Sequence, residues 1–208
     1  MPKFYLSDEK MMIALGRVPK ARHIHKFGAR TGIDTSPATI WDDGTTYPWS
    51  AFDTAQVLTI TGTDAGLPIT VVGLDANYDE ITEEIEVGAT GTTEFKRVAR
   101  AFVTGTTANV SDVFIRVGGA TGTVVAQINA GKAQTLMCLY TIPRNHTGLL
   151  LKGVATASAD KDMIIEFYGR FLLEDGSYGP FRIQHEANLY QSNYVYEFGI
   201  PLALPEKT

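Results

Sequence analysis

From Ala51 onward, short apolar segments recur at regular spacing and are separated by turn residues. Most of them alternate apolar and polar residues at period two, which puts successive side chains on opposite faces of a strand. In "EITEEIEV" the isoleucines and the valine share one face and most glutamates the other, with Glu83 as a polar member of the apolar row. About ten such segments predict an all-β fold, an antiparallel β-sandwich or jelly roll. The predicted strands are "QVLTITG", "PITVVGL", "EITEEIEV", "EFKRVARAFV", "VFIRVGG", "GTVVAQIN", "QTLMCLYTI", "GLLLKGVAT", "MIIEFYGRFLL" and "PFRIQHEA".

The connections between these segments hold most of the 20 glycines, as in "TGTDAG", "VGATGTT" and "EDGSYGP". Glycine is favoured where the chain reverses tightly with a positive φ. A helix is predicted only weakly, as one or two turns in "SDEKMMIALGRV" with Ser7 as the N-cap.

Residues 1–50 differ from the rest, because they combine four prolines and many basic residues with few alternating apolar ones. This composition predicts an extended N-terminal arm that becomes ordered on a neighbour. We therefore divide the chain into an arm with an aromatic junction, residues 1–50, and a β-sandwich domain, residues 51–208.

The charge is distributed unevenly along the chain. Residues 1–35 hold seven Lys or Arg against three Asp or Glu, a net charge of +4. The overall net charge is −5, so the remaining residues carry a net charge of −9. The segment "KARHIHKFGARTG" from Lys20 to Gly32 is the most basic part and contains two of the four histidines. The asymmetry indicates a basic arm that meets an acidic surface of another protein, with a solvated loop as the alternative. Nucleic acid is not expected as a partner, because the acidic remainder would repel phosphate.

Two patterns invite a metal-site interpretation. His23 and His25 form an H-x-H pair, but the nearest carboxylate is Asp34 and a third ligand is missing, so no metal is expected there. "DANYDEITEEIE" places Asp75, Asn77 and Asp79 at the first three ligand positions of a calcium loop. The sixth position is Glu80 where a glycine is required, which favours a hairpin and leaves only a weak calcium candidate.

Catalytic motifs are not apparent, and neither an enzyme nor a cofactor is predicted. The chain has no G-x-S-x-G elbow, and "AQINAGKA" departs from a phosphate-binding loop at both ends. The single cysteine, Cys138, excludes an internal disulfide and is expected as a small buried side chain in an apolar strand. No signal peptide or membrane-spanning run is recognised, so we expect folding in a reducing cytoplasm and no membrane partner.

Two aromatic groups are candidates for recognition. Trp41, Tyr47 and Trp49 lie close together in "TIWDDGTTYPW" and suit either core anchoring at the sandwich edge or a contact between subunits. Near the C-terminus, a strand would place Tyr194, Tyr196 and Phe198 on one face, and with Tyr190 these residues suggest a carbohydrate-binding surface or, alternatively, a packed core.

Several of these segments together resemble virion structural proteins of tailed bacteriophages. They are "HKFGARTGIDT", "TIWDDGTTYPW", "VVGLDANYDEITEEIEV", "FKRVARAFV" and "LYTIPRNHTGLLL", which cover residues 20–155 in that order. The resemblance implies a non-enzymatic virion protein, either a capsid-decorating (cement) subunit that stabilises the shell through its arm or a tail or fibre component that binds host carbohydrate. Its implied partners are copies of itself, as a trimer, and other virion proteins such as the major capsid protein. The residues we expect to contact partners are Arg22, His23, His25, Lys26, Phe27, Arg30, Trp41, Tyr47 and Trp49.

Overall fold

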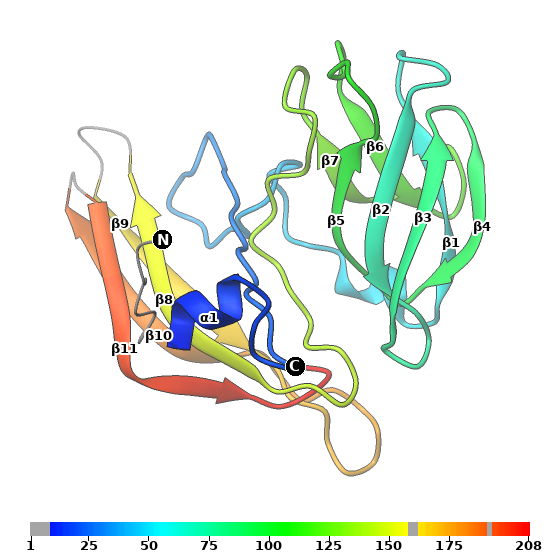
Figure 1. The fold of residues 1–208 in the computed structure, drawn as a ribbon. Helices are drawn as coiled ribbons and strands as arrows, with labels where there is room; N and C mark the ends of the chain where they lie inside the picture. Colours follow the sequence, from blue (N-terminus) through cyan, green and yellow to red (C-terminus); the bar gives the residue numbers. More distant parts are fainter. Residues whose placement is uncertain (1–8, 158–161, 191–192) are drawn as a thin grey trace, which may run out of the picture.

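The computed structural model describes residues 9–157, 162–190 and 193–208, and it is nearly all-β (Figure 1). The antiparallel β-sandwich prediction is confirmed, with eleven strands in the described residues. The elements are α1 (Glu9–Ala14), η1 (Trp49–Phe52), β1 (Gln56–Thr61), β2 (Pro68–Leu74), β3 (Glu80–Glu86), β4 (Thr90–Phe95), β5 (Arg97–Val103), β6 (Val113–Val117), β7 (Thr123–Ile128), β8 (Gly148–Thr156), β9 (Asp162–Gly169), β10 (Arg182–Tyr190) and β11 (Asn193–Leu204).

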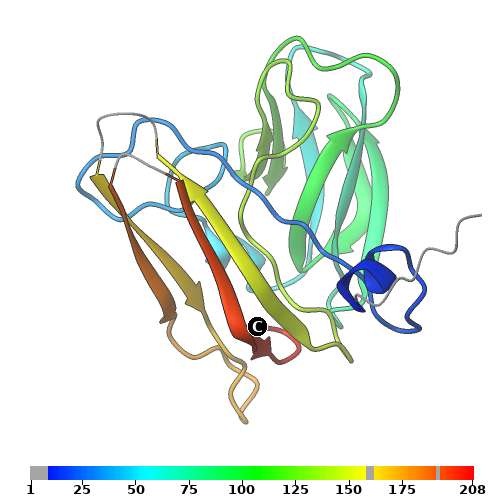
Figure 2. The same cartoon turned by 60° about the vertical axis from the view of Figure 1, so that its left-hand side comes forward.

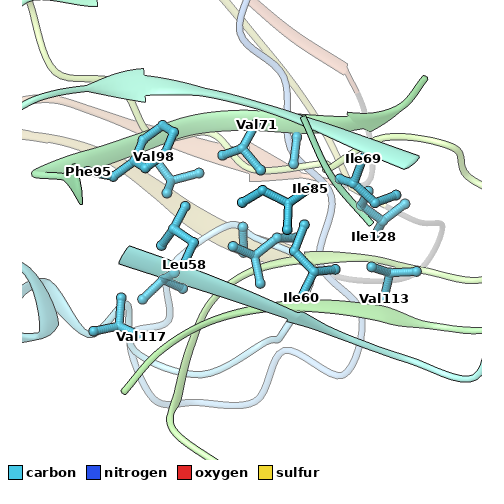
Figure 3. Close-up of a cluster of buried hydrophobic side chains, with 14 of the residues drawn as sticks. Leu58, Ile60, Ile69, Val71, Ile85, Phe95, Val98, Val113, Val117 and Ile128 are labelled. Carbon is cyan, nitrogen blue, oxygen red and sulfur yellow. The ribbon is translucent and has the colours of Figure 1, made fainter. Parts of the chain in front are cut away.

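Strands β1 to β7 form a two-sheet sandwich, here called the first unit. One sheet has the order β4-β1-β6-β7 and the other the order β3-β2-β5, with all neighbours antiparallel. Figure 1 shows the two sheets face to face in cyan and green. The interior is apolar because each strand turns its alternate aliphatic residues inward. Figure 3 shows Leu58 and Ile60 of β1 facing Val71 and Ile85 of the other sheet, and these four side chains are buried.

Two predicted strands differ from the observed ones. "EFKRVARAFV" is broken at Lys96, where the chain passes from β4 in one sheet to β5 in the other. "QTLMCLYTI" forms no strand beyond a single bridge between Gln134 and Phe102, although it remains extended. This segment lies against the edge of β5 and then leaves the first unit, so its apolar residues pack without a continuous strand partner. Strand β4 lies in a glycine-rich stretch that we had assigned to a connection.

Strands β8 to β11 form the second unit, which consists of two separate antiparallel ribbons, β8 with β11 and β9 with β10. The ribbons meet through His185 of β10, whose ring stacks on Tyr196 of β11 with centroids 4.1 Å apart. A two-stranded ribbon has few backbone hydrogen bonds and little area to bury, so it needs packing against something else for stability. Strands β8, β9 and β11 of the second unit accordingly keep many exposed residues.

Arginine and aromatic side chains join the two units. The guanidinium group of Arg170 lies 4.7 Å from the ring centre of Trp49 and 4.4 Å from that of Tyr178. The Tyr178 hydroxyl donates a hydrogen bond to the Tyr78 hydroxyl over 2.9 Å. Burial lowers the pKa of Arg170, and the neighbouring charge of Arg97 lowers it further. The cation–π contacts of Arg170 offset the hydration that its guanidinium group loses on burial, and they hold the second unit against the first.

Residues 15–48 contain no helix or strand. They run beside the connection from β7 to β8, to which they are joined by backbone hydrogen bonds from Ala29 to Leu136 (3.3 Å) and from Cys138 to Ile40 (2.9 Å). The predicted short helix is present as α1, whereas its predicted N-cap, Ser7, lies outside the described residues. The division at residue 50 stays a prediction.

Candidate assembly surface

Three basic residues of the predicted arm point inward and bind the same chain. Arg22 forms a bidentate ion pair with Glu80 at the start of β3, with one contact of 2.6 Å. The ammonium group of Lys26 donates a hydrogen bond to the carbonyl of Ala99 on β5 over 2.5 Å, and Arg30 donates to a backbone carbonyl nearby over 3.0 Å. Arg22 and Lys26 therefore dock the arm onto the first unit, whereas Arg30 ties the arm to its own continuation at Thr39, and each of the three cations is paired within the chain.

Close backbone packing at Gly28 reinforces this docking. A β-carbon at this position would lie 2.6 Å from the backbone nitrogen of Cys138 and 3.0 Å from the carbonyl oxygen of Ile40. Such separations are too short for real carbon contacts. Only glycine lets the arm lie this close to the connection between β7 and β8.

The opposite side of the arm carries His23, His25 and Phe27, which we call the arm stripe. These residues occupy alternate positions of an extended segment and are exposed, Phe27 to 42%. Their rings follow one another, with centroids 6.4 Å apart for the histidine pair and 5.5 Å apart for His25 and Phe27. Arg17 and Lys20 are also exposed. The arm stripe is therefore an ordered row of imidazole and phenyl groups with basic charge beside it.

The pKa of Lys26 leads to a prediction about pH. Burial lowers this pKa to about 8 from its ordinary value of 10.5; Cys138 opposes the change and the charge of Arg100 adds to it. Between these two values the unfolded chain binds more protons than the folded chain, so folding stability rises with pH in this window, and below about pH 8 the buried charge costs stability. We expect Lys26→Met to remove this rise, which amounts to roughly 2 kcal/mol between pH 7 and pH 9.5.

Urea unfolding at the two pH values, carried out with and without Lys26→Met, measures this effect. A Cys138→Ser background is needed because the Cys138 thiol and Lys26 influence each other's charge; although Cys138 is exposed as a whole residue, desolvation raises the pKa of its thiol. An equal pH dependence of the free energy of unfolding in the proteins with and without Lys26→Met would contradict the assignment of this effect to Lys26.

The aromatic junction residues do not form one surface. Trp41 is 1% exposed and Tyr47 is 3% exposed, and both belong to the core of the first unit. Burial raises the pKa of the Tyr47 phenol far above its usual range. We therefore remove these two residues from the predicted partner surface, since their side chains offer no exposed area. Trp49 lies between the units and packs against Phe181 with centroids 5.4 Å apart.

The weak calcium candidate forms a hairpin turn between β2 and β3. The Asp75 carboxylate accepts hydrogen bonds from the backbone N–H groups of Asn77 (2.8 Å) and Asp79 (2.9 Å). The Asp79 carboxylate pairs with Arg144 at 2.9 Å. The Asp75 carboxylate thus stabilises the turn, and the Asp79 carboxylate forms an ion pair. Over residues 9–157, 162–190 and 193–208, no three His, Cys, Asp or Glu side chains are grouped so as to hold a metal ion.

The expectation of a buried Cys138 is wrong. The residue is exposed, because its segment forms no strand inside a sheet and lies at the surface beside the arm. Its apolar neighbours misled the prediction, since alternate residues of the same segment, such as Met137, do enter the core.

The C-terminal aromatic residues share a face, as the alternation of β11 predicts. Tyr194, Tyr196 and Phe198 all pack around His185 of β10, with centroids between 4.1 and 6.3 Å from its ring. They are partly buried and fill the space between the two ribbons. This arrangement corresponds to the packed-core alternative. The side chain of Tyr190 lies outside the described residues.

The outer face of the β9–β10 ribbon, turned away from His185, is acidic and apolar, and we call it the acidic ribbon. Its cross-strand pairs are Tyr168 with Ile183, Glu166 with Glu186, and Ile164 with Asn188. Ile164 is 62% exposed and Ile183 is 51% exposed. A hydrogen bond to Glu166 raises the pKa of the Tyr168 phenol. The alternation in "DMIIEFYGRF" predicts that residues 164, 166 and 168 share a face, but nothing local identifies Glu186 as the partner of Glu166.

In the described part of the chain, no helix is long and apolar enough to cross a membrane. No protein-family model matches the chain, and no significantly similar curated protein or solved structure was found.

Proposed function

We propose that this chain is a non-enzymatic structural protein of a tailed-bacteriophage particle, a capsid-decorating subunit that helps to stabilise the shell. It would be made in the host cytoplasm and then become part of the virion. Its partners would be copies of itself and other virion proteins, such as the major capsid protein. The motifs within residues 20–155 that resemble such virion proteins support the proposal.

One structural observation carries the proposal, namely the arm stripe. The inward cations and Gly28 hold the arm in place, so His23, His25 and Phe27 are displayed at no further cost in chain entropy. Aromatic rings with adjacent basic groups are typical of contact surfaces between proteins. A preorganised contact of this kind suits a subunit that decorates a shell, because less free energy is lost in ordering the chain on binding.

The experiment is an add-back assay with particles that lack this protein. We expect purified protein to bind such particles saturably, and a His23→Ala/His25→Ala/Phe27→Ala variant to lose about tenfold or more in affinity, since removing a central aromatic and its neighbours from a contact typically costs over 1 kcal/mol. The control is Thr82→Ala/Glu84→Ala/Glu86→Ala, which changes three exposed residues of β3 and should bind like the wild type.

Failure of the wild-type protein to bind the particles would contradict the proposal. Specific, saturable binding of the isolated protein to glycans would instead favour the tail or fibre component, for which the candidate residues were Tyr190, Tyr194, Tyr196 and Phe198.

A further inference from the structure

The acidic ribbon contains a local conflict that the single chain leaves unresolved. Glu166 and Glu186 lie directly opposite each other on neighbouring strands. Like charges in this position destabilise a strand pair. At the corresponding place on the other ribbon, Glu197 lies opposite Lys152 and forms an ion pair of 3.6 Å. Among the described residues, no ion pair involves Glu166 or Glu186.

Exposed apolar side chains flank this pair of glutamates. Ile164 lies on one side of it, and Tyr168 and Ile183 lie on the other. Figure 2 shows the β9–β10 hairpin at the left margin of the molecule, where its strands are the orange and brown arrows. Glu166 accepts a hydrogen bond from the Tyr168 hydroxyl, but no described cation neutralises the charge of either glutamate. Apolar groups around two acidic charges make this face suited to a partner that brings basic groups and apolar surface together.

The arm stripe has these properties. Its imidazole N–H groups donate to carboxylates in either protonation state, and Phe27, which is 42% exposed, supplies apolar area. Its spacing also fits, because alternate residues of an extended segment repeat about every 6.6 Å, as do alternate residues along β9 and β10. With the arm lying along the ribbon, His25 can therefore meet the glutamate pair, while Phe27 and His23 meet the adjacent pairs Tyr168–Ile183 and Ile164–Asn188.

We propose that the arm stripe of one copy of this chain binds the acidic ribbon of a second copy. The contact is head-to-tail, because it joins two different surfaces, and successive contacts close into a ring when the rotation between copies allows it. The proposal rests on the proposed function in one respect, namely that the arm stripe is an assembly contact. It adds that the binding partner of the arm stripe is the acidic ribbon of a second copy.

Self-association of the purified full-length protein tests this contact, separately from any particle. We expect sedimentation velocity over a range of micromolar concentrations to show concentration-dependent association of the wild type, weakened at high salt because exposed charges are screened. His23→Glu/His25→Glu and Glu166→Arg/Glu186→Arg should each weaken it about tenfold or more. The control Glu84→Arg/Glu94→Arg changes two exposed glutamates of the first unit and should associate more like the wild type.

Mixing the two charge-reversed variants is the decisive step. Each supplies the surface that the other lacks, and the two altered surfaces are complementary to each other, so the mixture should associate more strongly than either variant alone. Glu166→Gln/Glu186→Gln separates folding from binding, because removing the repulsion should maintain or raise the unfolding midpoint while association weakens.

Three results would overturn the inference: a wild type that stays monomeric, variants that associate like the wild type, or a mixture that does not associate. A monomeric wild type that still binds particles would overturn this inference while leaving the proposed function intact.

Discussion

Replacing Trp41 with alanine is expected to lower the free energy of unfolding by about 3–5 kcal/mol, the usual cost of removing a large aromatic side chain from a core. The indole is 1% exposed, packs edge-on against Tyr47 with centroids 5.0 Å apart, and donates a hydrogen bond of 2.6 Å to the carbonyl of Thr45. Its removal leaves a cavity and an unpaired carbonyl. Urea unfolding followed by circular dichroism measures the change.

The matched variant is Trp49→Ala, which removes the other tryptophan from the joint between the units. We expect a smaller loss of stability, because Trp49 is only partly buried. If Trp41→Ala left stability unchanged but abolished association, Trp41 would be a contact residue and its assignment to the core would be wrong.

Substituting valine for Gly28 is expected to cost about 2–3 kcal/mol if the arm stays docked, because the new β-carbon would overlap backbone atoms of two other segments. Release of the arm is the alternative response, and it would free the arm stripe from its fixed orientation. Limited trypsin digestion detects release, since the arm contains Arg17, Lys20, Arg22, Lys26 and Arg30. We expect cleavage in this region to be much faster than in the wild type.

Ala29→Val is the control for this experiment, because residue 29 is exposed and tolerates a larger side chain. Unchanged stability together with unchanged cleavage in Gly28→Val would show that the arm does not pack closely against the connection between β7 and β8.

Much of the fold follows from local patterns. Strand β3 was predicted correctly with its apolar face, because alternation at period two reports directly which side of a strand is buried. Glu83, the polar member of that row, accepts hydrogen bonds from the backbone N–H groups of Thr92 (2.7 Å) and Thr93 (3.2 Å) on β4. The prediction of a strand around Cys138 was wrong for the opposite reason. The segment is apolar and extended, but an extended segment becomes a strand only when it pairs with a partner that is distant in the sequence.

The candidate assembly surface was likewise predicted from the sequence only in part. Composition alone identified a basic arm and an acidic remainder, since charge can be counted along a sequence. The tertiary structure decided that Lys26 and Arg30 point inward whereas His23, His25 and Phe27 point outward. That orientation depends on which backbone the arm lies against.

By itself, the sequence determined that this chain is an all-β protein with a basic N-terminal segment, because strand alternation and charge are properties of neighbouring residues. Only the tertiary structure decided that Trp41 belongs to the core, that the strands divide into two units, and that Glu166 lies opposite Glu186. Each of these depends on pairing between residues far apart in the chain, which is selected by the packing of the whole molecule and has no local signature.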